Sequence, residues 1–440
     1  MPNEITLPVL DSSGVEVVES HLHPKASYAL DDHLAPTGKE EVWRFTPLSR
    51  IASLLDAKSA VGPLKWAWDN DGDLVDLTEF PDAPPDEPSS CHAGDSPSRH
   101  SARSRRIHLA GTTTATTFGP LTIADAKALG TQAPFDRVAA AAFNGATEGL
   151  SIDVPAGAVL DAPIVIKAVG ENKPAYGRTH ISLGAAASAT IVFDYSGLAD
   201  YAEYLDVTLA AGAKLAFVSI QDWQAGAVHG GQHSFEVGPG AELKSVTVTL
   251  GGDLVRLMET VRYAGEGGHA EMFGVYFADA GQHQEHRLFI DQNQPKTVSR
   301  VDYRGALQGD GAHTVWVGDV LIRRNAHGID SYEANKNLIL TDGARADSVP
   351  NLEIETGNIV GAGHSSTTGR FDEEQLFYLM SRGISELEAR RLVVQGFFFD
   401  IIRRIGVPQV EEHLQDAVNA ELTRAAEAEA RTNTNEQRSV

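Results

Sequence analysis

Four similar stretches decide how the middle of this chain folds: VPAGAVL at 154–160, LGAAASA at 183–189, LAAGAKL at 209–215 and VGPGAEL at 237–243. Each stretch places a turn of small residues before a run rich in β-forming residues. The stretches begin at intervals of 29, 26 and 28 residues. Near-constant spacing between short strands indicates stacked coils that share one continuous core. A parallel β-helix fits this pattern, and a β-sandwich built from hairpins is the alternative.

The strand pattern extends to both sides of these repeats. From about residue 135 to about residue 360, Val, Ile, Thr, Tyr and Phe alternate with polar residues, and glycine turns interrupt them. The chain has 440 residues and 42% hydrophobic content, so it can bury a large core. We therefore expect a mainly β protein whose core spans residues 135–365.

Helical regions are expected on both sides of the core. Residues 1–80 have a mostly helical character, and Thr37 with Glu40 three residues later suggests a capping box in front of VWRF. After residue 366, Asp372 can cap a helix that ends near Gly383. Ser385 can begin the next helix, and a third helix is expected over about 409–430. Residues 366–440 are thus expected to form a C-terminal helical domain with a polar tail.

A segment of different composition separates the N-terminal region from the core. The run FPDAPPDEPSSCHAGDSPSRHSARSRR at 80–106 is rich in proline and serine and then in arginine. Low hydrophobicity predicts a linker or a low-complexity insertion over residues 81–134. No aromatic residue interleaves the arginines, which argues against a nucleic-acid site. Cys91, the one cysteine of the chain, lies here with no second pair of ligands nearby.

The charge balance narrows the class of partner. There are 60 acidic and 36 basic residues, and the net charge of −24 disfavours binding to nucleic acid or to an anionic membrane. The first residues lack the pattern of a signal peptide, and no segment approaches the roughly 20 apolar residues of a membrane span. A single cysteine is compatible with a reducing compartment, so a cytoplasmic location is expected.

Two closely spaced histidines could belong to the metal site of an enzyme. The motif HGGQH contains His229 and His233, which faintly suggests a cupin-type metal site in a barrel. The motif lacks the close His-x-His pair of such sites. No glycine-rich phosphate loop and no nucleophile elbow occur in the sequence. A cupin-type metalloenzyme using His229 and His233 therefore remains the alternative from another functional class.

The end of the core carries a family resemblance. The stretch NLILTDGARADSVPNLEIETGNIVGAGHSSTTGRFDEEQLFYLMSRGISELEARRLVVQGFFFD at 337–400 resembles the SufB/SufD family of iron–sulfur cluster assembly proteins. The resemblance is most specific from SYEANKNLIL at 331–340 to SRGI at 381–384. It implies a right-handed parallel β-helix and so decides against the sandwich. Relatives can carry cysteine where this chain has Ala344 and Ala362, and one thiol cannot hold a four-thiolate cluster. The resemblance is therefore to SufD and not to SufB.

The resemblance also implies a role and partners. It implies a non-catalytic subunit of a SufBCD complex, in which this chain pairs with a SufB-like scaffold and a SufC-like ABC ATPase docks on the C-terminal helices. The docking candidates are Phe377, Arg382, Phe397, Phe398 and Phe399.

One histidine carries the resemblance at the expected cluster site. In HSSTTG at 364–369, His364 matches the family's histidine at the SufB interface. The family implies that this histidine assists a nascent cluster, as a transient metal ligand. No cofactor is expected to stay on this chain alone. Whether a flavin binds the complex, and whether the chain forms a homodimer in isolation, stays open.

Overall fold

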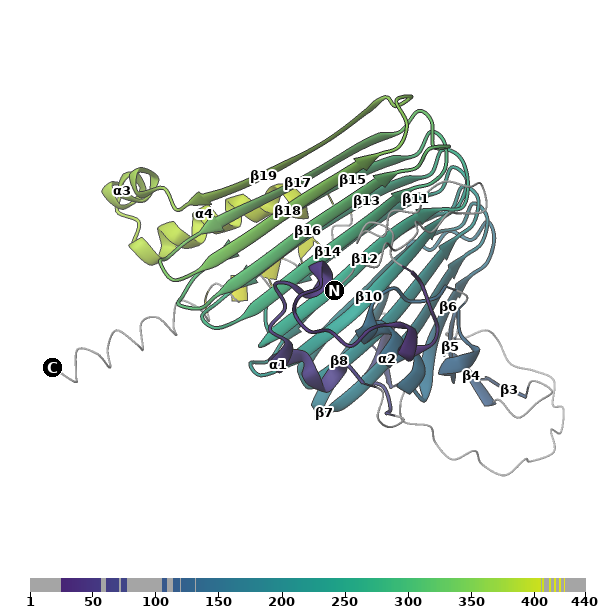
Figure 1. Cartoon of the computed structure of the whole chain (residues 1–440). Helices are drawn as coiled ribbons and strands as arrows, with labels where there is room; N and C mark the ends of the chain where they lie inside the picture. Colours follow the sequence, from purple (N-terminus) through teal and green to yellow (C-terminus); the bar gives the residue numbers. More distant parts are fainter. Residues whose placement is uncertain are drawn as a thin grey trace, which may run out of the picture.

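The core of the protein is a parallel β-solenoid, in which the chain winds through successive coils of short strands (Figure 1). The structure is a computed structural model that describes residues 25–56, 61–70, 73–76, 105–108, 114–118, 120–130, 132–404 and scattered positions between 406 and 423. The expected mainly β fold with a parallel β-helix core is confirmed.

Two parallel sheets form the walls of the solenoid, and the long strands β7 (Ile164–Leu183) and β8 (Ser188–Leu209) run through both. Sheet A continues from their second halves with β10 (Val228–Val237), β12 (Leu254–Tyr263), β14 (His283–Gln292), β16 (His313–Ile322) and β18 (Arg345–Ile354). Sheet B continues from their first halves with β9 (Lys214–Trp223), β11 (Glu242–Thr249), β13 (His269–Ala278), β15 (Val298–Leu307), β17 (Asp330–Ile339) and β19 (Gly361–Arg370).

The repeated stretches of the sequence form corners of the coils. The fourth residue of each stretch has a left-handed backbone, with φ of 72° at Gly157, 56° at Ala186, 65° at Gly212 and 59° at Gly240. Glycine adopts this conformation without steric cost, which explains the small residues at these positions. The spacing seen in the sequence is therefore the length of one coil.

Side chains alternate between the inside and the outside of the coils. The inside is a continuous hydrophobic core that includes Trp66, Phe193, Phe217, Tyr276 and Trp316. Strand β14 is buried along its whole length, whereas β18 is half-buried. Burial therefore falls towards the last coil.

Antiparallel strands extend the first coils. Strand β6 (Glu148–Val154) pairs with β5 (Leu121–Asp125), which continues to β4 (Thr114–Phe118) and β3 (Arg105–His108). Strands β1 (Lys65–Asn70) and β2 (Asp73–Asp76) add to the first half of β7. These strands fall within the expected helical region and linker, so the strand content begins earlier than predicted. Tryptophan and threonine in WAW at 66–68 and TATT at 114–117 favour strands, and the open edges of β6 and β7 provide partners for them.

The N-terminal region covers the outside of sheet A with short elements: η1 (Leu30–Asp32), η2 (Glu41–Trp43), α1 (Leu48–Ile51), η3 (Ala52–Leu54), η4 (Ala126–Ala128) and α2 (Arg137–Gly145). The helix expected after Thr37 is only the three-residue turn η2. Thr37 Oγ1 donates to a Glu40 carboxylate oxygen at 2.6 Å and does not cap a backbone amide. The buried Arg256 lies 3.9 Å from the centroid of the Trp43 ring and pairs with Asp136 at 2.7 Å, which fastens this region to β12.

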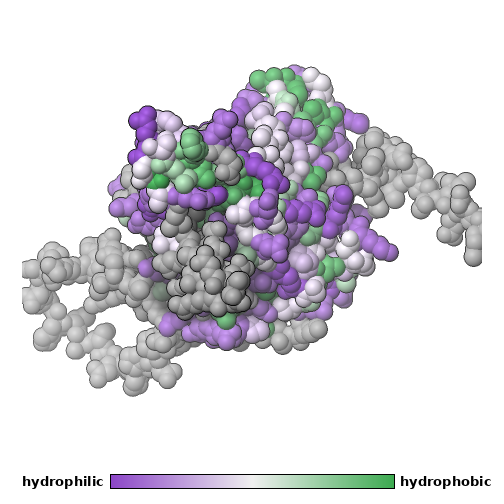
Figure 2. All heavy atoms as spheres, turned by 90° about the vertical axis from the view of Figure 1, so that its left-hand side faces the viewer, coloured by the Kyte–Doolittle hydropathy of each residue, from purple (hydrophilic) through white to green (hydrophobic). Residues whose placement is uncertain are grey.

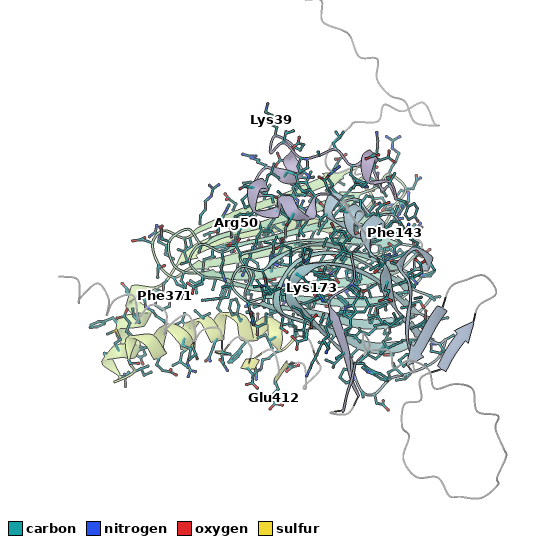
Figure 3. All side chains as sticks on the ribbon, turned by 90° about the horizontal axis from the view of Figure 1, so that it is seen from below. Lys39, Arg50, Phe143, Lys173, Phe371 and Glu412 are labelled. Carbon is teal, nitrogen blue, oxygen red and sulfur yellow. The ribbon has the colours of Figure 1, made fainter. Side chains whose placement is uncertain are left out.

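Helices α3 (Glu373–Ser381) and α4 (Glu386–Ile402) follow the solenoid. The expected caps are confirmed: Asp372 accepts from the Glu374 amide at 2.9 Å, Ser385 accepts from the Glu388 amide at 3.3 Å, and Gly383 has a φ of 86°. Helix α4 packs on the outside of sheet B, opposite the N-terminal elements (Figure 3). Most of the third expected helix, at 409–430, lies outside the described residues.

Candidate functional site

The last coil exposes residues that face inward in earlier coils. Strand β19 pairs with β17 and strand β18 pairs with β16, and among the described strands no further coil covers β18 or β19. Inward positions of β19, such as His364, therefore lie at an open end of the solenoid. The terminal coil, defined here as β16 to β19, brings polar side chains from both sheets to this end.

His364 lies in strand β19. It pairs in register with Glu333 of β17. Parallel pairing with β17 satisfies the backbone of this polar segment, so it forms a strand despite its lack of large apolar residues. The His364 Nδ1 atom lies 3.9 Å from Glu333 Oε1, and the two side chains are 42% and 1% exposed. A buried carboxyl group thus lies directly beneath a solvent-accessible imidazole.

Glu333 is in an unusual electrostatic environment. Burial raises the pKa of its carboxyl group to about 8, and the negative charge of Asp319 adds to the increase. Neither carboxylate oxygen has a hydrogen-bond partner among the described residues. At neutral pH the group is mainly protonated unless a cation compensates its charge.

The sequence analysis did not identify Glu333, although it lies in the quoted stretch SYEANKNLIL. The signal is an alternation: Ser331, Glu333, Asn335 and Asn337 are all buried on the inward face of β17. Four polar residues at every second position of a strand predict a polar inward face. Only the coil geometry shows that this face meets His364.

Ala344 and Ala362 lie near this end of the solenoid. Ala362 is half-buried two residues before His364 and packs against the interior core, whereas Ala344 precedes β18. Neither supplies a metal ligand. Cys91 falls outside the described residues.

The cupin interpretation of His229 and His233 is wrong. Both residues are fully buried in strand β10 of the parallel solenoid, and not in a cupin barrel. His233 Nε2 lies 3.1 Å and His229 Nε2 lies 3.4 Å from the same oxygen of Glu203. Burial would raise the pKa of Glu203, but hydrogen bonds from the two histidines lower it overall. Within the described part of the chain, no group of three or more His, Cys, Asp or Glu residues is placed to hold a metal ion.

The five docking candidates on the C-terminal helices differ in exposure. Phe377 is 74% exposed, and the exposed Arg382 lies over the ring of Tyr378 at 5.2 Å. Phe397 and Phe399 are half-buried against sheet B. Phe398 is fully buried in the same cluster, so it packs the chain's own core and cannot contact a partner.

The exposed candidates therefore belong to α3 and the turn after it. Figure 2 shows hydrophobic patches between hydrophilic side chains on the side of the molecule that carries α3. None of the described helices combines the length and apolar character that a membrane crossing needs.

Comparison with known proteins gives one consistent family. Residues 165–397 match the SufBD core domain of the SUF system for FeS cluster assembly. An iron–sulfur cluster assembly SufBD family protein of Mycobacterium tuberculosis is 43% identical over 418 residues, which cover 92% of this chain and 95% of that protein. A SufBD family protein of Mycobacterium leprae is 43% identical over 406 residues, which cover 90% and 93% of the two chains.

A second kind of relative matches only in part. Another SufBD family protein of Mycobacterium tuberculosis is 27% identical over 201 residues, which cover 46% of this chain and 24% of that protein. A protein of the same description in Mycobacterium leprae is 28% identical over 201 residues, covering 46% and 23%. Each organism therefore contributes one relative of similar extent and one that is much longer.

Proposed function

Because this chain belongs to the SufBD family of iron–sulfur cluster assembly proteins, we propose that it is a SufD-type subunit of a cytoplasmic SufBCD assembly complex. In this role it pairs with a SufB-like scaffold, carries a SufC-like ABC ATPase and catalyses no reaction alone. The observation that carries the proposal is the composition of the terminal coil. His364 is exposed there, while Ala344 and Ala362 bring no thiol. The thiolates that a cluster needs therefore come from a partner.

The open end of the solenoid supports pairing with another family member. Each of the strands β18 and β19 has a ladder partner on one side only among the described strands. Exposed strand edges are common sites of association, because their backbone groups can bind a second chain. The two kinds of mycobacterial relatives are consistent with a complex of two different SufBD proteins.

The surface of α3 supports ATPase docking. Phe377, Tyr378 and Met380 are exposed large hydrophobic residues at 74%, 57% and 44%, and Arg382 adds a positive charge beside them. Aromatic residues and arginine are common among the few residues that contribute most of the binding energy at protein interfaces. We assign the docking surface to these residues, while Phe397 and Phe399 of α4 are half-buried against sheet B.

His364 is the residue that would meet the nascent cluster. Imidazole binds iron and replaces thiolate at some cluster sites. The cluster itself is the cargo of the complex, so its other ligands belong to the scaffold. The role of this chain is to place one imidazole at the surface where the cluster forms.

Co-purification tests the subunit assignment. The full chain is co-expressed with the SufB-like and SufC-like proteins of its own organism, and a complex that contains all three is expected. Failure of the folded chain to co-purify with either protein would contradict the assignment.

Cluster assembly on this complex tests His364. His364→Ala is expected to reduce the rate of cluster formation, while SufB pairing and ATP hydrolysis persist. His327→Ala is the matched control, because His327 is also exposed but lies in the turn before β17. A parental rate in His364→Ala would show that the imidazole has no part in assembly.

A further inference from the structure

Glu333 is a buried acid whose carboxyl group makes no hydrogen bond within the described part of the chain. The residue is 1% exposed, and neither carboxylate oxygen has a hydrogen-bond partner among the described residues. Buried polar side chains are almost always hydrogen-bonded, since an unpaired one costs several kcal/mol. A group that departs from this rule is a candidate for binding something outside the chain.

The strand next to Glu333 leaves space for its side chain. A Cβ atom placed on Gly318 of β16 would lie 2.4 Å from Glu333 Oε2 and 2.4 Å from Trp316 Cη2. Only glycine at this position leaves room for the carboxylate to reach across the interior. Trp316 Nε1 and Ser348 Oγ are also buried, with no hydrogen-bond partner in the described part of the chain, and these two residues pair in register on β16 and β18. The inside of the terminal coil thus contains several unpartnered polar groups.

His364 connects this buried group to the solvent. Its side chain is 42% exposed, and its Nδ1 atom lies 3.9 Å from Glu333 Oε1. Bonds from a divalent transition metal to imidazole nitrogen or carboxylate oxygen measure about 2.1 Å. The separation of the two atoms is therefore less than two such bonds, so a single ion can bridge them.

We propose that Glu333 and His364 together form a half-site for one divalent iron ion at the open end of the solenoid. The carboxylate supplies an oxygen ligand and a negative charge, and the imidazole supplies a nitrogen ligand, a combination that suits Fe²⁺, Co²⁺ and Zn²⁺. Because the described residues provide no third protein ligand, water completes the coordination in the isolated chain and the partner completes it in the complex.

The inference rests on the proposed function for the identity of the ion and the partner, but the half-site itself belongs to this chain. Glu333 then gives the cluster site a second ligand beside His364.

The test is a metal titration of the full-length chain without its partners. Co²⁺ replaces Fe²⁺ as the probe. The ion is stable in air, and its visible absorption reports the type of ligand that it binds. The parental protein is expected to bind one Co²⁺ saturably. Glu333→Gln, which keeps the shape of the side chain and removes the charge, is expected to weaken Co²⁺ binding at least tenfold.

His364→Ala is expected to weaken binding to a similar extent, and the double variant is expected to be no weaker than the weaker single variant. His327→Ala is the control and should bind Co²⁺ as the parental protein does. Urea unfolding of each variant checks that the fold is retained.

Two results would overturn the proposal: a parental protein with no saturable Co²⁺ binding, or a folded Glu333→Gln variant with parental affinity. Parental affinity in this variant would mean that Glu333 is simply a neutral buried acid. Both results come from the isolated chain. They therefore test the half-site separately from the co-purification experiment, which tests whether the complex forms.

Discussion

His286 lies inside the solenoid on the fully buried strand β14, stacked on Tyr276 with ring centroids 5.0 Å apart. Its Nε2 atom is 2.9 Å from Thr249 Oγ1, while its Nδ1 atom has no partner among the described residues. Burial lowers the pKa of His286 to about 3, although the charge of Glu285 opposes this change. The imidazole is therefore neutral in the folded protein throughout the physiological range.

This pKa predicts a loss of stability in mild acid. Below the ordinary pKa of about 6.5, the unfolded chain binds a proton at His286 and the folded chain does not, so stability falls from pH 6.5 towards pH 3. At pH 5 the loss from this residue is about 2 kcal/mol. His286→Phe keeps the stacking and removes the titration. Urea unfolding at pH 7.5 and pH 5 should show a smaller acid loss in the variant, and equal losses in both proteins would contradict the prediction.

At the scale of residues, the sequence named His364 as a candidate but gave no information on its surroundings. The family resemblance identified the histidine, whereas its strand and its neighbour Glu333 depend on the register between β17 and β19. The two residues are 31 positions apart, and no local pattern links them. The same reason explains the error at His229 and His233, since only the solenoid shows that both are enclosed with Glu203.

At the scale of elements, α4 is held by one apolar face against sheet B. Phe398, Ile401 and Ile402 are almost fully buried there, and Arg304 of β15 pairs with Asp400 at the same contact. The family resemblance had made all three phenylalanines at 397–399 docking candidates. In the structure the three residues differ. Phe398 lies on the face of α4 that is buried against sheet B, whereas Phe397 and Phe399 are only partly buried.

This division predicts opposite effects for two phenylalanines. Phe398→Ala removes a fully buried ring and is expected to cost about 3–5 kcal/mol of stability. Phe377→Ala removes an exposed ring and should change stability by less than about 0.5 kcal/mol, yet it should weaken capture of the SufC-like ATPase. Thermal unfolding and a pull-down measure the two effects.

Leu34→Ala is the control for the ATPase pull-down. Leu34 is 82% exposed but belongs to the N-terminal region, which covers the opposite sheet. It should affect neither stability nor capture. Unchanged ATPase capture by the Phe377 variant would remove α3 from the docking surface.

The elements that the sequence predicted best have local causes. The corners follow from small residues with left-handed backbones, and the helix caps follow from Asp372, Ser385 and Gly383. The early strands β1 to β5 were missed, although β1 with β2 and β4 with β5 form local hairpins. Only the pairing of β1 with β7 joins segments that are distant in sequence. The length of the helix after Thr37 was overestimated. The segment forms only the short turn η2, in which Trp43 packs against Arg256 of β12.

At the scale of the whole molecule, burial predicts a gradient of protection. Strand β14 is buried throughout, β18 is half-buried and β19 is largely exposed. Amide hydrogens of β14 are expected to exchange slowest and those of β19 fastest, because local opening is easiest where few contacts must be broken. Hydrogen–deuterium exchange by mass spectrometry measures this directly.

Binding of the SufB-like partner should slow exchange in β18 and β19 and leave β14 unchanged. Uniform exchange along the solenoid in the free chain would contradict the gradient. A partner that protects only the N-terminal elements would place the subunit contact on the outside of sheet A.

Because the coils stack in one direction, the number of coils sets the length of the solenoid. Arg256 fastens the N-terminal region at β12, while Glu333 and His364 lie on later coils, and neighbouring strands in a sheet are about 4.8 Å apart. Inserting or deleting one coil between these points would lengthen or shorten the molecule by about that distance. The local construction of each end would not change. Gain or loss of one repeat therefore changes the length of the solenoid in whole steps and leaves the construction of both ends unchanged.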